Sequence, residues 1–201
     1  LTDTAWMTIG FRSDDHDTFG RANTGRATLA WQVVPDRVKL RTSYGTAFRS
    51  PSFLDLYGQS AYYAGNPDLR PEEARGWDVG ADVYFADQKG SASVSYFDSD
   101  YDDLIIYDFG AFPGTTANVE SARMRGLEAK ASWSLADATE VRVNYSYLDA
   151  DNVSNGTRLL RRPRHSGGVD LWHDFGNGFD LGAGLGFVAD RKDVHAGNFS
   201  T

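Results

Sequence analysis

Hydrophobic and polar residues alternate strictly over most of the chain. Nine segments show the period-two pattern of a strand that has one apolar and one polar face. They lie near residues 5–11, 27–33, 38–46, 77–85, 92–96, 127–134, 140–147, 165–174 and 179–187. The segment 165–174 is the least regular. No stretch of useful length shows helical periodicity, so the pattern predicts an all-β chain.

The connections between these segments alternate in length. Short turns are expected near residues 35–36, 87–89, 136–138 and 176–178. Long connections are expected near residues 13–25, 48–72, 104–117 and 150–163, and another begins near residue 190. In an antiparallel up-and-down meander, this alternation places every tight turn at one rim and every long loop at the other, as in outer-membrane barrels. A soluble sandwich with Greek-key connections gives no reason for it.

Alternation alone leaves open whether the apolar face is buried in a core or turned toward lipid. The polar faces carry charged and small residues, which suit a wide hydrated lumen. Aromatic residues lie on the apolar faces near strand ends, where the girdle of a membrane barrel would be. They are Trp31, Trp77, Trp133, Tyr145 and Tyr147. The sequence therefore favours an antiparallel up-and-down transmembrane β-barrel over a soluble β-protein.

Composition narrows the class further. The 201 residues have a net charge of −8, which argues against a nucleic-acid surface. There is no cysteine, so a disulfide scaffold and a thiolate metal site are excluded. No run of eighteen apolar residues is present, so no transmembrane helix is predicted. The first residues lack the basic and apolar regions of a signal peptide, and we expect the chain to begin inside a larger protein.

The longest connection, near residues 48–72, differs in composition from a disordered segment. It is rich in aromatic residues and proline rather than in Ser, Lys and Glu. Pro51, Pro67 and Pro71 each fix a backbone angle and stiffen the crossing. Connections of this length are usually functional when they are ordered. The alternative is a packed surface loop without a role in function.

The same connection carries a family resemblance. Residues 48–51, 56–57 and 65–72 resemble the two sequence boxes around a long external loop of TonB-dependent outer-membrane transporters. Within that family the chain is most similar to the cobalamin-transporter branch, which residues 103–108, 125–128 and 159–162 resemble. The resemblance extends from about residue 4 to residue 188, nearly the whole chain.

The resemblance implies an architecture of about 22 strands around a plug domain. Residues 1–201 would then be a partial barrel domain of roughly nine strands, without the plug and the remaining strands. It also implies a protein of the Gram-negative outer membrane that captures a scarce, large solute and performs no chemistry on it. Implied partners are the TonB energy-coupling protein, through an N-terminal segment that the sequence lacks, and membrane lipid with lipopolysaccharide. No enzyme and no nucleic-acid partner are expected.

The expected solute is a cobalamin-type corrinoid or a ferric siderophore. Two other functions stay open: a passive porin-like or adhesin barrel without energy coupling, and a soluble β-structured binding module. Heme is disfavoured because residues 52–64 contain no histidine between the two boxes. The four histidines lie at unrelated positions, and no nucleophile motif accompanies them.

Two groups of residues are candidates for ligand binding. The first would offer flat aromatic contact area to a large ligand, or would instead pack the loop on itself. It consists of Phe53, Tyr57, Tyr62 and Tyr63. The second is Arg161 and Arg162, in a cluster with Arg158 and Arg164. These arginines suit anionic siderophores or the phosphates of lipopolysaccharide, and a solvated loop edge is the alternative.

No resident cofactor is expected, and metal candidates are weak. Asp14, Asp15 and Asp17 could bind calcium in the first long connection. Alternation assigns Asp98 and the acidic residues after it to the polar row of a strand, which favours a lining of the lumen over a metal site.

Overall fold

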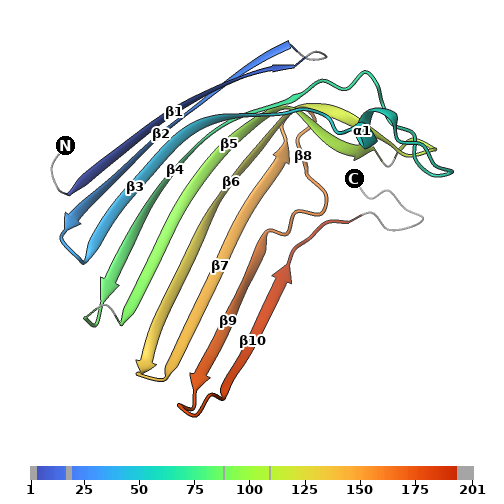
Figure 1. Ribbon diagram of the computed structural model, residues 1–201. Coiled ribbons are helices and arrows are strands. Elements are labelled where there is room, and N and C mark those ends of the chain that lie inside the picture. The colour runs from blue at the N-terminus through green and yellow to red at the C-terminus, as the bar shows by residue number, and fades with distance from the viewer. Residues whose placement is uncertain (1–3, 17–19, 88, 109, 194–201) are drawn as a thin grey trace.

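The computed structural model describes residues 4–16, 20–87, 89–108 and 110–193, which form one antiparallel sheet (Figure 1). The strands are β1 (Ala5–His16), β2 (Gly20–Val34), β3 (Val38–Arg49), β4 (Glu72–Phe85), β5 (Gly90–Asp108), β6 (Thr115–Ala136), β7 (Thr139–Asn152), β8 (Thr157–Arg158), β9 (His165–Asp174) and β10 (Asp180–Ala189). Nine of them follow one another across the sheet, and β8 pairs only with β7. The all-β, up-and-down prediction is confirmed. The path from β1 to β10 is open, so the barrel is not closed within the described residues.

Three of the long connections are shorter than the alternation predicts. β1 and β2 stay paired as far as His16 opposite Gly20, so most of residues 13–25 are strand. β5 and β6 stay paired as far as Asp108 opposite Thr115. β7 continues to Asn152, within the expected connection 150–163. The sequence pattern misses these extensions because the two faces of a strand there either meet polar surroundings or pack against other connections, and the contrast between alternate residues is lost.

One short helix, α1 (Phe53–Tyr57), lies in the connection between β3 and β4. Within the described ranges, no helix is long and apolar enough to cross a membrane.

The register of the sheet joins the apolar faces of neighbouring strands into a continuous surface. Residues directly opposite each other in an antiparallel pair point to the same face. One such row passes through Trp31, Leu40, Ala81, Val94, Ala129, Tyr145, Gly167 and Phe187. The pairing thus assembles nine separately alternating strands into one apolar face.

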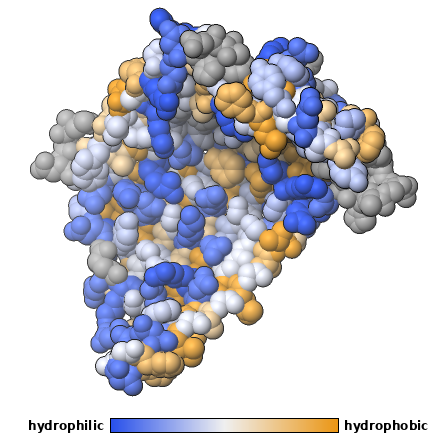
Figure 2. All heavy atoms as spheres, turned by 45° about the vertical axis from the view of Figure 1, so that its right-hand side comes forward, coloured by the Kyte–Doolittle hydropathy of each residue, from blue (hydrophilic) through white to orange (hydrophobic). Residues whose placement is uncertain are grey.

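This apolar face is the exposed one. Along β3, Leu40 and Tyr44 are exposed, while Lys39 and Arg41, on either side of Leu40, are half-buried. Figure 2 looks onto a hollowed face on which hydrophilic residues predominate. A water-soluble sheet has the opposite arrangement, with its apolar face covered by protein. A membrane barrel has this arrangement, with its apolar band turned outward.

Charged residues on the polar face are paired across strands. The ammonium of Lys39 lies 3.1 Å from the carboxylate of Asp82. Arg41 contacts the same carboxylate at 3.4 Å and donates a hydrogen bond to Ser93 at 3.3 Å. These contacts link β3, β4 and β5 on the inner side, so the polar face holds its charges without a protein core.

Aromatic pairs mark the two ends of the apolar band. Trp77 packs against Tyr96 with ring centroids 5.5 Å apart, and Phe85 packs against Trp133 at 6.2 Å. Trp77 and Phe85 are eight residues apart on β4. That separation corresponds to about 27 Å along a strand, or about 20 Å along the axis of a barrel with strands tilted by about 40°. The band therefore fits the apolar height of an outer-membrane barrel.

An arginine placed in the middle of this band tests which medium covers it. In the complete barrel, Val94→Arg should lower the free energy of unfolding by about 2–4 kcal/mol, because the charge would enter hydrocarbon. The measurement is denaturant unfolding in lipid bilayers. Ser146→Arg is the matched control at similar depth, since Ser146 lies on the polar face opposite Glu128. Equal losses for both variants would contradict the assignment of the faces.

Candidate functional site

The connection between β3 and β4 is an ordered structure with its own small core. Its helix α1 begins with a capping box, in which Ser52 Oγ accepts from the amide of Asp55 at 3.1 Å. The carboxylate of Asp55 accepts from the amide of Ser52 at 2.9 Å in return. Leu56 and Leu69 are buried beneath the connection. The expectation of order, based on the prolines and aromatic residues, agrees with this geometry.

Hydrogen bonds fasten this connection to the end of the β5–β6 hairpin. The Tyr63 hydroxyl donates to the carbonyl of Leu54 at 3.2 Å and lies 3.2 Å from Thr116 Oγ1. Asn66 Nδ2 donates to the carbonyl of Thr116 at 3.1 Å. The ring of Tyr63 stacks on Tyr107 with centroids 6.0 Å apart. These residues hold the backbone of the connection in place.

Similar contacts fix the backbone of residues 65–72, which form one of the two sequence boxes. The Asn118 side chain accepts from the amide of Arg70 at 2.9 Å and donates to its carbonyl at 3.0 Å. The Glu72 carboxylate is buried, accepts two hydrogen bonds from Arg49 at 2.6 and 2.5 Å, and accepts a third from the amide of Ile105 at 2.7 Å. Because Arg49 ends β3 and Glu72 begins β4, this pair closes the base of the connection.

The end of the β5–β6 hairpin is itself held on two faces. Leu104 joins a buried cluster with Ala122, Ala150 and Leu159, which come from β6, from β7 and from the segment after β8. Residues alternate in a strand, so Tyr107 lies on the opposite face, against the connection. Asp103, in the left-handed region with φ of 56°, stands just before this part of β5. The hairpin therefore serves as a rigid support.

The predicted aromatic residues divide into two groups. Phe53, Tyr57 and Tyr62 are 84%, 59% and 74% exposed, and the rings of Phe53 and Tyr57 lie 6.4 Å apart. Tyr63 is half-buried and holds the connection together. Leu54 and Phe112, which the sequence analysis did not single out, are also strongly exposed. Alternation does not identify them, because they lie outside the strands.

The arginines of the connection 153–164 are mostly paired. Arg161 lies 3.1 Å from the carboxylate of Asp193, and its amide donates to the carbonyl of Lys192 at 2.8 Å. Arg158 contacts Asp190 at 3.0 Å. Arg162 is exposed and makes no hydrogen bond or ion pair with a described residue. The predicted cluster thus fastens the connection to the segment after β10.

Comparison with known proteins identifies the family to which this fold belongs. The barrel model of TonB dependent receptor-like proteins matches residues 1–200. The chain belongs to the TonB-dependent receptor family. The family predicted from the sequence is confirmed, and its cobalamin branch stays a prediction.

Solved receptors share the fold of this TonB-dependent receptor. A point mutant of the ferric enterobactin receptor PfeA of Pseudomonas aeruginosa, in complex with enterobactin, gives a TM-score of 0.78 at 22% identity over 96% of this chain and 31% of its own. The copper transporter OprC gives 0.77 at 17% identity over 94% and 33%. The siderophore receptor PirA of Pseudomonas aeruginosa gives 0.73 at 18% over 93% and 35%. The chain spans about a third of their length, and at these identities the likeness shows the fold.

The calcium candidates of the receptor are engaged elsewhere. Asp14 pairs with Arg12 at 2.6 Å, and Asp15 lies 3.5 Å from Arg21. Asp17 lies outside the described residues. In the described part of the chain, no group of three or more His, Asp or Glu residues is arranged to hold a metal ion. Calcium binding stays a prediction.

The assignment of Asp98 to the polar row is wrong. The register places Asp98 opposite Trp77 and in line with Tyr96, on the apolar face. It is buried against Arg123, which donates two hydrogen bonds at 2.9 and 2.5 Å. The apolar face becomes ionic beyond the aromatic pair of Trp77 and Tyr96, because there the strand leaves the apolar band. The change from apolar to acidic residues at Asp98 thus marks the end of the apolar band and not a change of face.

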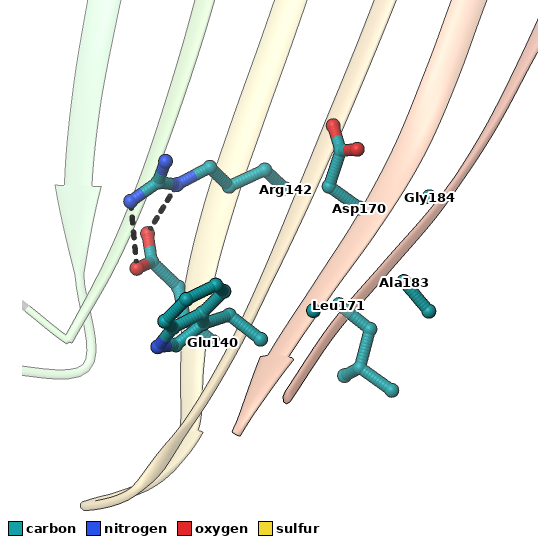
Figure 3. A pocket seen from close by; sticks show the side chains of 8 residues that line it. Glu140, Arg142, Asp170, Leu171, Ala183 and Gly184 are labelled. Atoms are coloured by element: carbon teal, nitrogen blue, oxygen red, sulfur yellow. Dashed lines mark hydrogen bonds and ion pairs between the residues drawn. The ribbon is translucent and has the colours of Figure 1, made fainter. Parts of the chain in front are cut away.

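The polar wall of the receptor contains a hollow of about 540 Å³ between β7, β9 and β10 (Figure 3). Arg142 donates two hydrogen bonds to Glu140 at 2.8 and 2.9 Å, and Asp170 lies across from this pair. The ring of Trp172 lies where Gly182 leaves space, since a Cβ there would come within 2.8 Å of it. The lining of the hollow combines this ion pair and Asp170 with the apolar side chains of Leu171 and Ala183. Alternation along single strands does not reveal the hollow, because its residues come from three strands.

Loss of the Glu72 carboxylate should loosen the connection. In the complete receptor, Glu72→Gln should raise hydrogen exchange across residues 50–71 by about 10–100-fold, because a buried charged acceptor contributes about 1.5–3 kcal/mol. Glu73→Gln is the matched control, since Glu73 is the exposed neighbour. Unchanged exchange in Glu72→Gln would show that the pair with Arg49 does not close the connection.

The contact between Arg158 and Asp190 should resist acid. The hydrogen bond from Arg158 lowers the pKa of Asp190 below its ordinary value. A lowered pKa gives stabilisation that is present at neutral pH and is lost as pH falls through the lowered value. The protection factor of the Arg161 amide should therefore hold from pH 7 to about 4, the ordinary range of aspartate, and fall only below it. A loss of protection between pH 7 and 5 would contradict this.

Proposed function

We propose that the complete receptor takes up a scarce, large solute across the outer membrane of a Gram-negative bacterium, by transport energised through TonB. Membership of the receptor family supports this role. The observation that carries it is the connection at residues 50–71. This connection exposes Phe53, Tyr57 and Tyr62, while Ser52, Tyr63 and Asn66 hold its shape. The solute is a cobalamin-type corrinoid or a ferric siderophore.

A fixed aromatic surface suits tight capture of a large solute. Burial of apolar area contributes about 25 cal/mol per Å², and a rigid binding surface loses little conformational entropy on binding. The capping box, the pair of Arg49 with Glu72 and the contacts of Tyr63 supply that rigidity. Capture needs no reaction of the solute, and the role requires binding and release alone.

The other surfaces of the sheet have roles that fit this transport. The exposed apolar face would contact membrane lipid, and the ionic residues beyond it would meet the head groups and lipopolysaccharide. The polar face, with the hollow beside Arg142, would line the passage of the solute. Contact with TonB would be made by a segment of the receptor outside this chain.

Removal of two exposed rings should weaken capture. Phe53→Ala combined with Tyr57→Ala should raise the Kd of the bound solute about tenfold or more, as expected for aromatic anchors. The measurement is equilibrium binding of a corrinoid and of ferric siderophores to the complete receptor in detergent. Phe179→Ala is the control, because Phe179 is exposed at the opposite rim. Absence of solute binding, with ion conduction in bilayers, would instead indicate a passive porin-like barrel.

A further inference from the structure

The exposed aromatic residues stand in an acidic setting. We define the aromatic platform as residues 49–72 with the hairpin end 103–118, apart from Phe109, which lies outside the described residues. Backbone hydrogen bonds join its two parts, from Ala64 to Gly114 at 2.9 Å and from Gly114 to Tyr62 at 3.0 Å. The described residues of the platform include two arginines, at positions 49 and 70, and no lysine. Its five acidic residues are Asp55, Asp68, Glu72, Asp103 and Asp108.

Both arginines of the platform are already engaged with carboxylates. Arg49 makes a bidentate pair with buried Glu72, and Arg70 lies 2.5 Å from the carboxylate of Asp103. In the described part of the platform, Asp68 and Asp108 form no salt bridge with an arginine or lysine. Asp55 forms none either, although Arg49 attracts it at longer range. Asp68 and Asp108 are exposed, on the connection and on the hairpin end respectively. A ligand at the exposed rings therefore meets negative charge.

The arginines of the connection 153–164 do not reverse this balance. Arg158 and Arg164 contact Asp190, at 3.0 and 3.5 Å, and Arg164 also contacts Asp149 at 3.2 Å. Arg161 contacts Asp193. These pairs neutralise most of the positive charge of the connection 153–164, so an anionic solute is attracted only weakly there.

We infer that the aromatic platform selects a bulky solute with apolar surface and with no net negative charge. This inference rests on the proposed function and specifies its solute. A solute of zero or positive charge gains contact with Phe53, Tyr57 and Tyr62 without repulsion, and aromatic faces attract cations. A trianionic iron complex would approach Asp55, Asp68 and Asp108 against like charges, most strongly at low ionic strength.

The test compares three probes on the complete receptor in detergent. Cyanocobalamin and a ferric trihydroxamate carry no net charge, whereas ferric enterobactin is trianionic. At least one neutral probe should bind at least tenfold more tightly than ferric enterobactin, and Phe53→Ala combined with Tyr57→Ala should remove that difference. Asp68→Lys should strengthen binding of ferric enterobactin about fivefold at low salt, and added salt should abolish the gain. The neutral probe should change less than twofold.

Asp180→Lys is the matched charge control, since Asp180 is exposed at the opposite rim. Equal gains in Asp68→Lys and Asp180→Lys would overturn the local role of the platform. Ferric enterobactin that binds the unaltered receptor as tightly as the neutral probes, in a manner that depends on Phe53 and Tyr57, would overturn the inference and leave the proposed function standing. Binding of none of the three probes would overturn both.

Discussion

The exposed apolar face is the constraint on which the rest of this structure depends. Hydrocarbon offers no hydrogen-bond partner, so every backbone group at that depth must be satisfied within the sheet. Continuous antiparallel pairing from β1 to β7, and on through β9 and β10, meets this demand for the strands between them. Each side chain of a strand then lies either on the apolar face or on the polar face, and successive residues alternate between the two. Ion pairs such as Lys39 with Asp82 can exist at this depth because they lie on the polar face.

Beyond the apolar band, other interactions determine the structure of the same strands and their connections. Water satisfies exposed backbone groups there, and side-chain contacts decide the shape of the connections. Three sets of contacts organise the chain there. They are the pair of Arg49 with Glu72, the contacts of Tyr63 with Thr116, and the cluster around Leu104. These contacts leave Phe53, Tyr57 and Tyr62 exposed on a rigid support. The function proposed for the receptor follows from that combination of rigidity and exposure.

The strands and their order were predictable because alternation records which surroundings each residue meets. The extensions of β1, β2, β5 and β6 were not, since residues 13–16 and 104–108 meet polar surroundings on both faces or pack against other connections. The error at Asp98 has the same origin. Among the candidate residues, the sequence proposes both Tyr57 and Tyr63 for ligand binding. It does not show that Tyr57 is exposed whereas Tyr63 holds the connection together. Tyr63 is held by Thr116, which is 53 residues away in the chain, and only the fold brings them together.

A nitroxide scan along β5 in lipid bilayers tests the central claim most directly. Labels placed singly from Ser91 to Asp102 would be measured for collision with oxygen, which dissolves in hydrocarbon, and with a water-soluble relaxation agent. The account predicts high oxygen access at Ala92, Val94 and Tyr96, low access at the serines between them, and loss of the alternation beyond Asp98. Access to the water-soluble agent at Ala92, Val94 and Tyr96 equal to that at the serines would contradict it.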